Sequence, residues 1–162
     1  MTLAELLADL HSPLSVQGAE RVPVREVCVD SRRAVPDCLF VALRGEHTDG
    51  HLYVHDAFDA GATAALVERP VRGAVTIDTV KRTGLRTVKL PVAIVVPDSL
   101  DALQRLAEAR RLARLDLRVV GVTGSIGKTT TKEAVAAVLA QRYATLKSPG
   151  NYNSEIGLPL TL

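Results

Sequence analysis

An apolar segment that runs into a glycine turn and then into Gly-Lys-Thr most constrains how this chain of 162 residues can fold. Leu117 to Val122 is nearly all apolar, which is typical of an inner strand of a parallel sheet. After the turn, residues 129–141 predict a helix and residues 143–146 predict a further strand. Strand, loop, helix and strand in this order predict the opening of a doubly wound α/β domain.

The turn itself reads Thr123-Gly124-Ser125-Ile126-Gly127-Lys128-Thr129-Thr130 and predicts a phosphate-binding loop. Such a turn presents backbone N–H groups and the positive end of the next helix to an anion, which its glycines can approach closely. The ammonium group of Lys128 can reach the β- and γ-phosphates of a nucleotide, and the Thr129 hydroxyl can ligate Mg²⁺. A strict Walker A motif has glycine where this chain has Val122, so the match is relaxed. The alternative, a plain helix start with a surface lysine, is disfavoured by the predicted strand before the turn and helix after it.

A second segment, from Ser148 to Pro159, is rich in glycine, proline and asparagine and follows the second predicted strand of this unit. Loops at the carboxyl ends of parallel strands line the ligand crevice of such domains. We therefore expect Asn151, Asn153 and Glu155 to face the same crevice as Lys128, where a carboxylate can hold a metal ion. The competing interpretation is an ordinary turn with a solvated Glu155, and the nearby phosphate loop favours the first.

Residues 1–97 predict a small α/β domain, and residues 98–162 predict the start of a larger second domain that is cut short. A helix is expected at residues 100–115, with Asp98 or Ser99 as its cap. Residues 69–91 fit either a hairpin or a loose insertion. In the first domain we expect helices at 2–10 (capped by Thr2) and 51–60 (ending at Gly61), and strands at 22–29, 39–43, 64–67 and 92–96.

Two groups of polar residues follow strands of this predicted first domain and are candidates for holding a polar ligand. They are Asp30-Ser31-Arg32 and Asp49-Gly50-His51. The histidines His47, His51 and His55 are also spaced by four, as metal ligands on one helix face would be. A glycine interrupts any helix that covers all three, so we favour a polar ligand loop or a solvated surface over a metal site.

Composition excludes several classes of function. Lys and Arg number 20 against 18 Asp and Glu, and aromatic residues make up 3%, so neither a polybasic surface nor a base-stacking platform for nucleic acid is expected. No apolar run approaches the roughly 20 residues of a membrane span, and the N-terminus lacks the basic start of a signal peptide. Cys28 and Cys38 either form a disulfide or, as we favour, remain free thiols in a reducing cytoplasm.

These segments, in this order, resemble the Mur ligases of peptidoglycan synthesis. The relaxed glycine spacing of the phosphate loop is typical of that family's ATP loop. Gly150 to Pro159 is most similar to the branch that joins D-alanyl-D-alanine to UDP-N-acetylmuramoyl-tripeptide. Asp30-Ser31-Arg32 and the stretch from Phe40 to His51 resemble the family's UDP-binding N-terminal domain. The resemblance covers nearly all of the chain, and residues 70–90 match least.

The resemblance implies an ATP- and Mg²⁺-dependent amide ligase that acts through an acyl phosphate, with Lys128 and Glu155 in catalytic roles. It implies that Mg²⁺ is held by Thr129 and Glu155. The ATP phosphates would be held by Thr123, Gly124, Ser125, Gly127, Lys128, Thr129 and Thr130. The UDP-linked substrate would be held by Ser31, Arg32, Asp49, Gly50, His51, Asn151 and Asn153.

Members of this family carry further nucleotide-binding residues and a third domain downstream of these motifs. Residues 1–162 alone are therefore expected to be inactive, and the full-length protein is expected to be a cytoplasmic monomer. Two alternatives stay open, namely a tripeptide-forming Mur ligase and a UDP-muramoyl-peptide binding module without catalysis. A P-loop kinase or GTPase fits less well, because it leaves the loops between Asp30 and His51 unexplained.

Overall fold

Two compact units make up the computed structural model, which describes residues 1–12, 14–45, 48–84, 86–150 and 152–161. The first unit spans Met1–Leu106 and the second Ala107–Leu162. The division falls inside helix α3 (Ser99–Leu112), whereas the sequence suggests a domain boundary just before this helix. Each unit is described by itself below.

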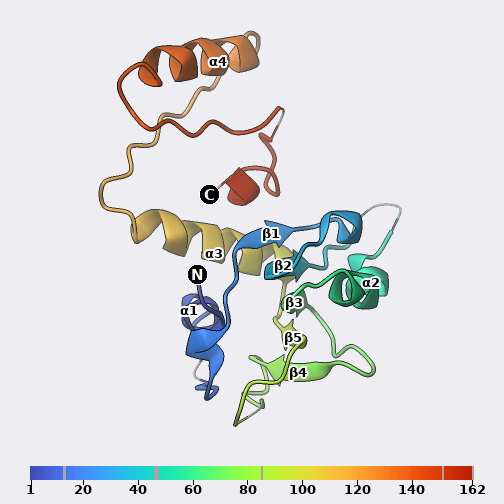
Figure 1. The fold of residues 1–162 in the computed structure, drawn as a ribbon. Coiled ribbons are helices and arrows are strands. Elements are labelled where there is room, and N and C mark those ends of the chain that lie inside the picture. Colours follow the sequence, from blue (N-terminus) through green and yellow to red (C-terminus); the bar gives the residue numbers. More distant parts are fainter. Residues whose placement is uncertain (13, 46–47, 85, 151, 162) are drawn as a thin grey trace. The chain divides into compact units, whose positions relative to one another are not determined.

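One parallel sheet of five short strands forms the centre of the first unit (Figure 1), in the order β1-β2-β3-β5-β4. The predicted buried strands β2, β3 and β5 are confirmed to within two residues at each end. These strands are continuous apolar runs because both faces of a parallel sheet are buried. The strands are β1 (Glu26–Cys28), β2 (Cys38–Val41), β3 (Ala64–Val67), β4 (Val75–Asp78) and β5 (Val92–Val95).

The strand predicted at residues 22–29 is wrong in its first half, because only Glu26–Cys28 joins the sheet. The backbone just before it pairs with the N-terminal segment instead. The Leu3 N–H donates to the Val22 carbonyl over 2.9 Å, and the Val24 N–H donates to the Met1 carbonyl over 2.8 Å. Hydrogen bonds that would extend β1 are therefore used to tie down the start of the chain.

The hairpin considered for residues 69–91 is also not what the structure shows. Strand β4 pairs with β5 in parallel, with Ile77 opposite Ile94, and forms one edge of the sheet. The turn after β4 closes on itself through two backbone hydrogen bonds between Asp78 and Thr83. The Asp78 carboxylate strengthens this turn by accepting the N–H groups of Val80 and Lys81.

Four helices and four short 3₁₀ turns complete the described elements. The predicted cap of the first helix is confirmed, because Thr2 and Glu5 form a reciprocal capping box. Asp98 caps α3 by accepting the Asp101 N–H over 2.8 Å. The helix expected at 51–60 begins as a 3₁₀ turn. The elements are α1 (Leu3–Asp9), η1 (Ala19–Arg21), η2 (Ser31–Arg33), η3 (Gly50–Tyr53), α2 (Val54–Asp59), α3, α4 (Lys128–Leu139) and η4 (Pro159–Thr161). Across the described ranges, no helix combines the length and the apolar character needed to cross a membrane.

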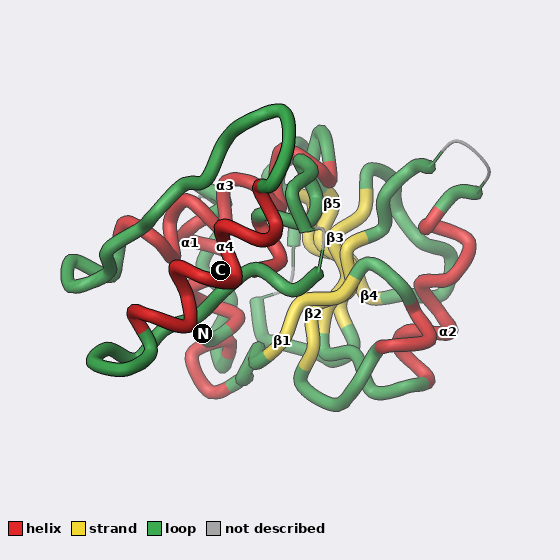
Figure 2. The backbone as a smooth tube through the Cα atoms, turned by 90° about the horizontal axis from the view of Figure 1, so that it is seen from above, coloured by secondary structure: helices red, strands yellow, loops and turns green. Residues whose placement is uncertain are grey.

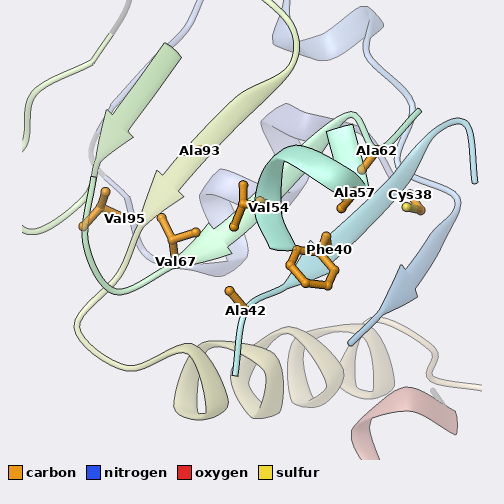
Figure 3. Packing of buried hydrophobic residues seen from close by; sticks show 10 residues of the cluster. Cys38, Phe40, Ala42, Val54, Ala57, Ala62, Val67, Ala93 and Val95 are labelled. Atoms are coloured by element: carbon orange, nitrogen blue, oxygen red, sulfur yellow. The ribbon is translucent and has the colours of Figure 1, made fainter. Parts of the chain in front are cut away.

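The helices of the first unit cover both faces of the sheet, with α2 on one side and α1 with the start of α3 on the other (Figures 1 and 2). Successive side chains along each strand point alternately toward these two helical layers. Figure 3 shows the Phe40 ring beneath α2, close to Val54 and Ala57. Leu39 and Leu66 alternate with that cluster and are fully buried.

The second unit contains α4, as predicted, but neither of the two strands expected there. The segments at 117–122 and 143–146 join no ladder in the described part of the chain. A strand needs hydrogen bonds to a neighbouring strand. Because these two segments have no such neighbour among the described residues, several of their apolar side chains are exposed to solvent. Val119 and Val120 are each 62% exposed. With α4 the two segments line a hollow of about 840 Å³.

Truncation of Phe40 to alanine should destabilise the first unit by about 3–5 kcal/mol, because the ring is 1% exposed and leaves a cavity between β2 and α2. Urea-induced unfolding followed by circular dichroism measures the change. Val80→Ala is the control, since Val80 is 56% exposed and should change stability by no more than about 0.5 kcal/mol. Equal effects of the two substitutions would show that the Phe40 cluster does not hold the unit together.

Candidate functional site

Polar residues follow the carboxyl ends of the three neighbouring strands β1, β2 and β3. Asp30, Ser31 and Arg32 come after β1, the loop from Arg44 to His51 comes after β2, and Glu68 with Arg69 comes directly after β3. Because all strand pairings are parallel, these carboxyl ends meet at one edge of the sheet. The edge is therefore the place where the first unit can hold a polar ligand.

Asp30 and Arg32 form a tightly held pair at this edge. The Asp30 carboxylate caps η2 by accepting the Arg32 N–H, and it also accepts Nε and Nη2 of the guanidinium over 2.9 and 2.7 Å. These hydrogen bonds lower the pKa of Asp30 to about 2. The Arg32 side chain is 86% exposed, and its guanidinium keeps three N–H donors outside this pair. Arg32 therefore displays a fixed positive group beside the partly buried Ser31.

Asp49 and His51 form the second predicted group, and here the histidine is inside the protein. Asp49 Oδ1 lies 2.6 Å from His51 Nδ1 and 3.0 Å from the His51 backbone nitrogen. The other ring nitrogen, Nε2, accepts the Glu68 N–H over 2.8 Å. A backbone N–H can only donate, so Nε2 is unprotonated and the proton sits on Nδ1. His51 therefore links the loop after β2 to the end of β3 as a neutral ring.

Gly50, between these two residues, is needed because the chain passes close to itself. Its N–H donates to the Leu43 carbonyl over 2.8 Å. A Cβ atom at this position would stand 2.8 Å from both the nitrogen and the oxygen of Leu43. Glycine thus allows the loop to fold back so that Asp49 and His51 reach β3.

Glu68 and Arg69 at this edge were not singled out from the sequence, and Arg44 was noted only within the stretch from Phe40 to His51. Arg69 donates to Asp49 Oδ2 over 2.7 Å, and Arg44 pairs with Glu68 over 2.9 Å. The guanidinium of Arg69, together with the hydrogen bonds from His51, holds the pKa of Asp49 far below its ordinary value. The signal was available, since Glu68 and Arg69 directly follow a buried strand, just as the predicted groups do.

The metal site weighed for the three histidines receives no support. The described residues contain no group of three or more histidine, cysteine or acidic side chains that could hold a metal ion. His51 uses both ring nitrogens, and His55 Nε2 lies 2.9 Å from the Arg72 carbonyl oxygen. His47 lies outside the described residues.

The two cysteines are free thiols, as favoured from the sequence. They lie on the neighbouring strands β1 and β2 with their sulfur atoms 3.8 Å apart. Burial, together with the adjacent Cys38, raises the pKa of Cys28 to about 12. The thiol is therefore protonated at neutral pH and is a poor nucleophile.

The glycine turn of the second unit leads directly into α4, as predicted, although the strand expected before it is not formed in the described residues. Gly127 adopts φ +80°, a left-handed conformation, and α4 begins at the next residue. In the described structure no side chain caps this helix, so its first N–H groups stay available to an anion. Lys128 Nζ lies over the loop, 2.5 Å from the Gly124 carbonyl oxygen. Thr123, Ser125, Thr129 and Thr130 are exposed around it.

Residues 154–157 form a compact turn. The Ser154 hydroxyl accepts the Gly157 N–H over 3.1 Å. Asn153 and Glu155 are exposed at this turn. Asn151, which was predicted to line the same crevice, lies outside the described residues. Lys132 of α4 donates to the carbonyl groups of Ser148 and Gly150, which lead into this segment.

Asp49→Asn should lower the free energy of unfolding by about 1–2 kcal/mol at pH 7. The amide oxygen can still cap η3, but the ion pair with Arg69 and the second carboxylate oxygen that accepts from it are lost. A carboxyl group whose pKa is lowered by folding stabilises the protein above its unfolded pKa, roughly 3.9, and this contribution is lost as pH falls below that value. Urea unfolding at several pH values should therefore show the variant approaching the wild type in acid.

Asp101→Asn serves as the matched control, since Asp101 makes only an exposed pair with Arg105 four residues on. It should cost about 0.5 kcal/mol or less at any pH. A difference between Asp49→Asn and the wild type that is the same at pH 7 and pH 3 would rule out an ionised Asp49.

Comparison with known proteins places these features in a family. Residues 23–111 match the model of the Mur ligase family catalytic domain, and residues 122–162 match the Mur ligase middle domain. The chain is 43% identical to UDP-N-acetylmuramoyl-tripeptide–D-alanyl-D-alanine ligase of Bacillus subtilis, with 99% of this chain and 32% of the relative covered. The same-named ligase of Escherichia coli is 39% identical, with 100% and 31% covered.

Solved structures show the same likeness. A crystal structure of MurF from Acinetobacter baumannii matches with a TM-score of 0.77 and 30% identity, covering 99% of this chain and 32% of that one. MurF ligase from Thermotoga maritima, solved in complex with ADP, matches with a TM-score of 0.67 and 34% identity, covering 85% of this chain and 28% of that one. The chain thus spans about 30% of the length of these relatives. The expected α/β architecture is confirmed, and the chain belongs to the Mur ligase family.

Proposed function

We propose that the protein is an ATP-dependent amide ligase of peptidoglycan precursor synthesis that joins D-alanyl-D-alanine to UDP-N-acetylmuramoyl-tripeptide. The observation that carries the proposal is the uncapped start of α4, with left-handed Gly127 before it and Lys128 as its first residue. This arrangement suits the phosphates of ATP. Relatives that are about 40% identical carry the name of this reaction.

At the ATP end, the loop from Thr123 to Thr130 would hold the phosphates through backbone N–H groups, and Lys128 would reach the β- and γ-phosphates. The Thr129 hydroxyl and the Glu155 carboxylate are oxygen donors, the type of ligand that Mg²⁺ prefers. Bound Mg²⁺ would offset negative charge on the transferring phosphoryl group. Lys128 has the same electrostatic role from the protein side.

The first unit would hold the UDP-linked substrate. Arg32 displays its guanidinium to solvent while Asp30 holds it in place, so it can bind a diphosphate without first being ordered. Ser31 lies beside it. Asp49, Gly50 and His51 act mainly by shaping the loop after β2, because His51 is 7% exposed. Asn153 and Asn151 would contact the same UDP-linked substrate, as the family resemblance implies.

The reaction then follows from ordinary acyl chemistry. The terminal carboxylate of the UDP-linked peptide attacks the γ-phosphorus of ATP, the bond to ADP breaks, and an acyl phosphate forms. The amine of D-alanyl-D-alanine attacks the activated carbonyl, an amide bond forms, and inorganic phosphate leaves. We place the two ends on separate domains, residues 1–97 and residues 98–162, in a monomeric cytoplasmic enzyme.

Lys128→Ala should lower phosphate release by the full-length natural protein at least about 100-fold, because a charge that stabilises the transferring phosphoryl group is lost. Release is measured with ATP, UDP-N-acetylmuramoyl-tripeptide and D-alanyl-D-alanine. The dissociation constant for the UDP-linked substrate, from calorimetry, should change less than about two-fold, because Lys128 does not belong to that subsite.

Arg32→Ala is the reciprocal control and should weaken binding of the UDP-linked substrate while leaving ADP binding unchanged. Loss of both ligands in either variant would argue against two subsites. Phosphate release that needs a single amino acid such as diaminopimelate or lysine, with the UDP-linked dipeptide, would point to the tripeptide-forming ligase. Binding of the UDP-linked substrate without any phosphate release would point to the binding module.

A further inference from the structure

Lys132 stands one helical turn after Lys128 on α4, so the two lysines lie on the same face of the helix. Its side chain is only 18% exposed, which is low for a lysine. Its ammonium group donates to the Ser148 carbonyl over 2.7 Å and to the Gly150 carbonyl over 2.9 Å. The helix that begins at the phosphate loop thus directly holds the backbone that leads to Asn153 and Glu155.

The donors of Lys132 are committed to these contacts. An ammonium group has three N–H donors, and two of them meet carbonyl oxygens at short distance. The Glu133 carboxylate lies 3.4 Å away on the remaining side. Charge-assisted hydrogen bonds of this length are about twice as strong as neutral ones, so two of them restrain the loop in position and direction.

We propose that Lys132 is a positioning residue that fixes the segment carrying Asn153 and Glu155 with respect to the phosphate loop; the consequence for catalysis rests on the proposed function. In the proposed function Lys128 would contact the phosphates, and Lys132, four residues later, would hold the segment that carries the Glu155 carboxylate. Groups that only orient a metal ligand typically change metal affinity or activity 10- to 100-fold when they are removed.

Lys147 offers a matched control in the same cluster. Lys147 also forms an ion pair with Glu133. Its substitution by methionine removes the same positive charge as Lys132→Met. The Lys147 side chain is 52% exposed, and its ammonium group contacts the Glu133 carboxylate rather than the carbonyl groups of the loop. Lys147→Met therefore tests the charge of the cluster while leaving in place the hydrogen bonds from Lys132 to the Ser148 and Gly150 carbonyl groups.

The test compares Lys132→Met, Lys132→Arg and Lys147→Met in the full-length natural protein. Hydrogen exchange should show faster exchange at residues 152–157 in Lys132→Met, and wild-type rates there in Lys147→Met. In steady-state assays, Lys132→Met should raise the KM for ATP and the Mg²⁺ concentration at half-maximal rate about 10-fold or more. Affinity for the UDP-linked substrate should stay within about two-fold in all three variants. Arginine also donates to two carbonyl groups at once, so Lys132→Arg should recover most of the loss.

The outcomes separate the two proposals. Unchanged exchange at residues 152–157 in Lys132→Met would overturn the positioning role, as would equal kinetic effects of Lys132→Met and Lys147→Met. Faster exchange in Lys132→Met with no ligase activity in the wild type would overturn the proposed function and leave the structural contact in place. A fall in melting temperature with equal loss of ATP and UDP-substrate binding would show a general stabilising role instead.

Discussion

Parallel pairing of five strands is the constraint on which the first unit depends, because it brings the carboxyl ends of all the strands to one edge. Hydrogen bonds along the ladder set only the order and register of the strands. The loops that leave β1, β2 and β3 must then start side by side. Asp30 with Arg32, Asp49 with His51, and Glu68 with Arg69 are neighbours for this reason, although up to 39 positions separate them in the sequence.

Charge is held in two different ways in the two units. In the first unit, side chains hold one another in place. Asp49 accepts hydrogen bonds from both His51 and Arg69, and His51 accepts one from the Glu68 N–H just after β3. In the second unit, the backbone itself carries the positive potential, at the start of α4, and Lys128 adds to it. The first arrangement suits recognition of a polar ligand of defined shape, and the second suits binding of an anionic group such as phosphate.

Much of this could be predicted from short stretches of sequence. The strands β2, β3 and β5 are continuous apolar runs, α1 has a capping box, and the glycine turn before Lys128 has a local signature. What could not be predicted depends on partners that are distant in the chain. Residues 22–24 pair with the N-terminus rather than with β2, and β4 joins β5 in parallel rather than folding into a hairpin.

The same limit applies to the candidate site. The apolar pattern at 117–122 indicates a strand, but a ladder needs a neighbour, and the described residues supply none there. Glu68 and Arg69 directly follow a buried strand, so their place at the carboxyl ends of the strands could be predicted from the sequence. Their ion pairs and the contacts of Lys132 appear only when the fold brings Asp49 to β3 and the loop at residue 148 to α4.

Transfer of oxygen from substrate to phosphate tests the proposed ligation most directly. The UDP-linked peptide is prepared with ¹⁸O in both oxygens of its terminal carboxylate and turned over by the full-length natural protein with ATP and D-alanyl-D-alanine. If an acyl phosphate forms and the amine attacks its carbonyl carbon, each released phosphate carries about one ¹⁸O atom, because the bridging oxygen leaves with phosphorus. Phosphate released without ¹⁸O while the amide product forms would contradict this mechanism.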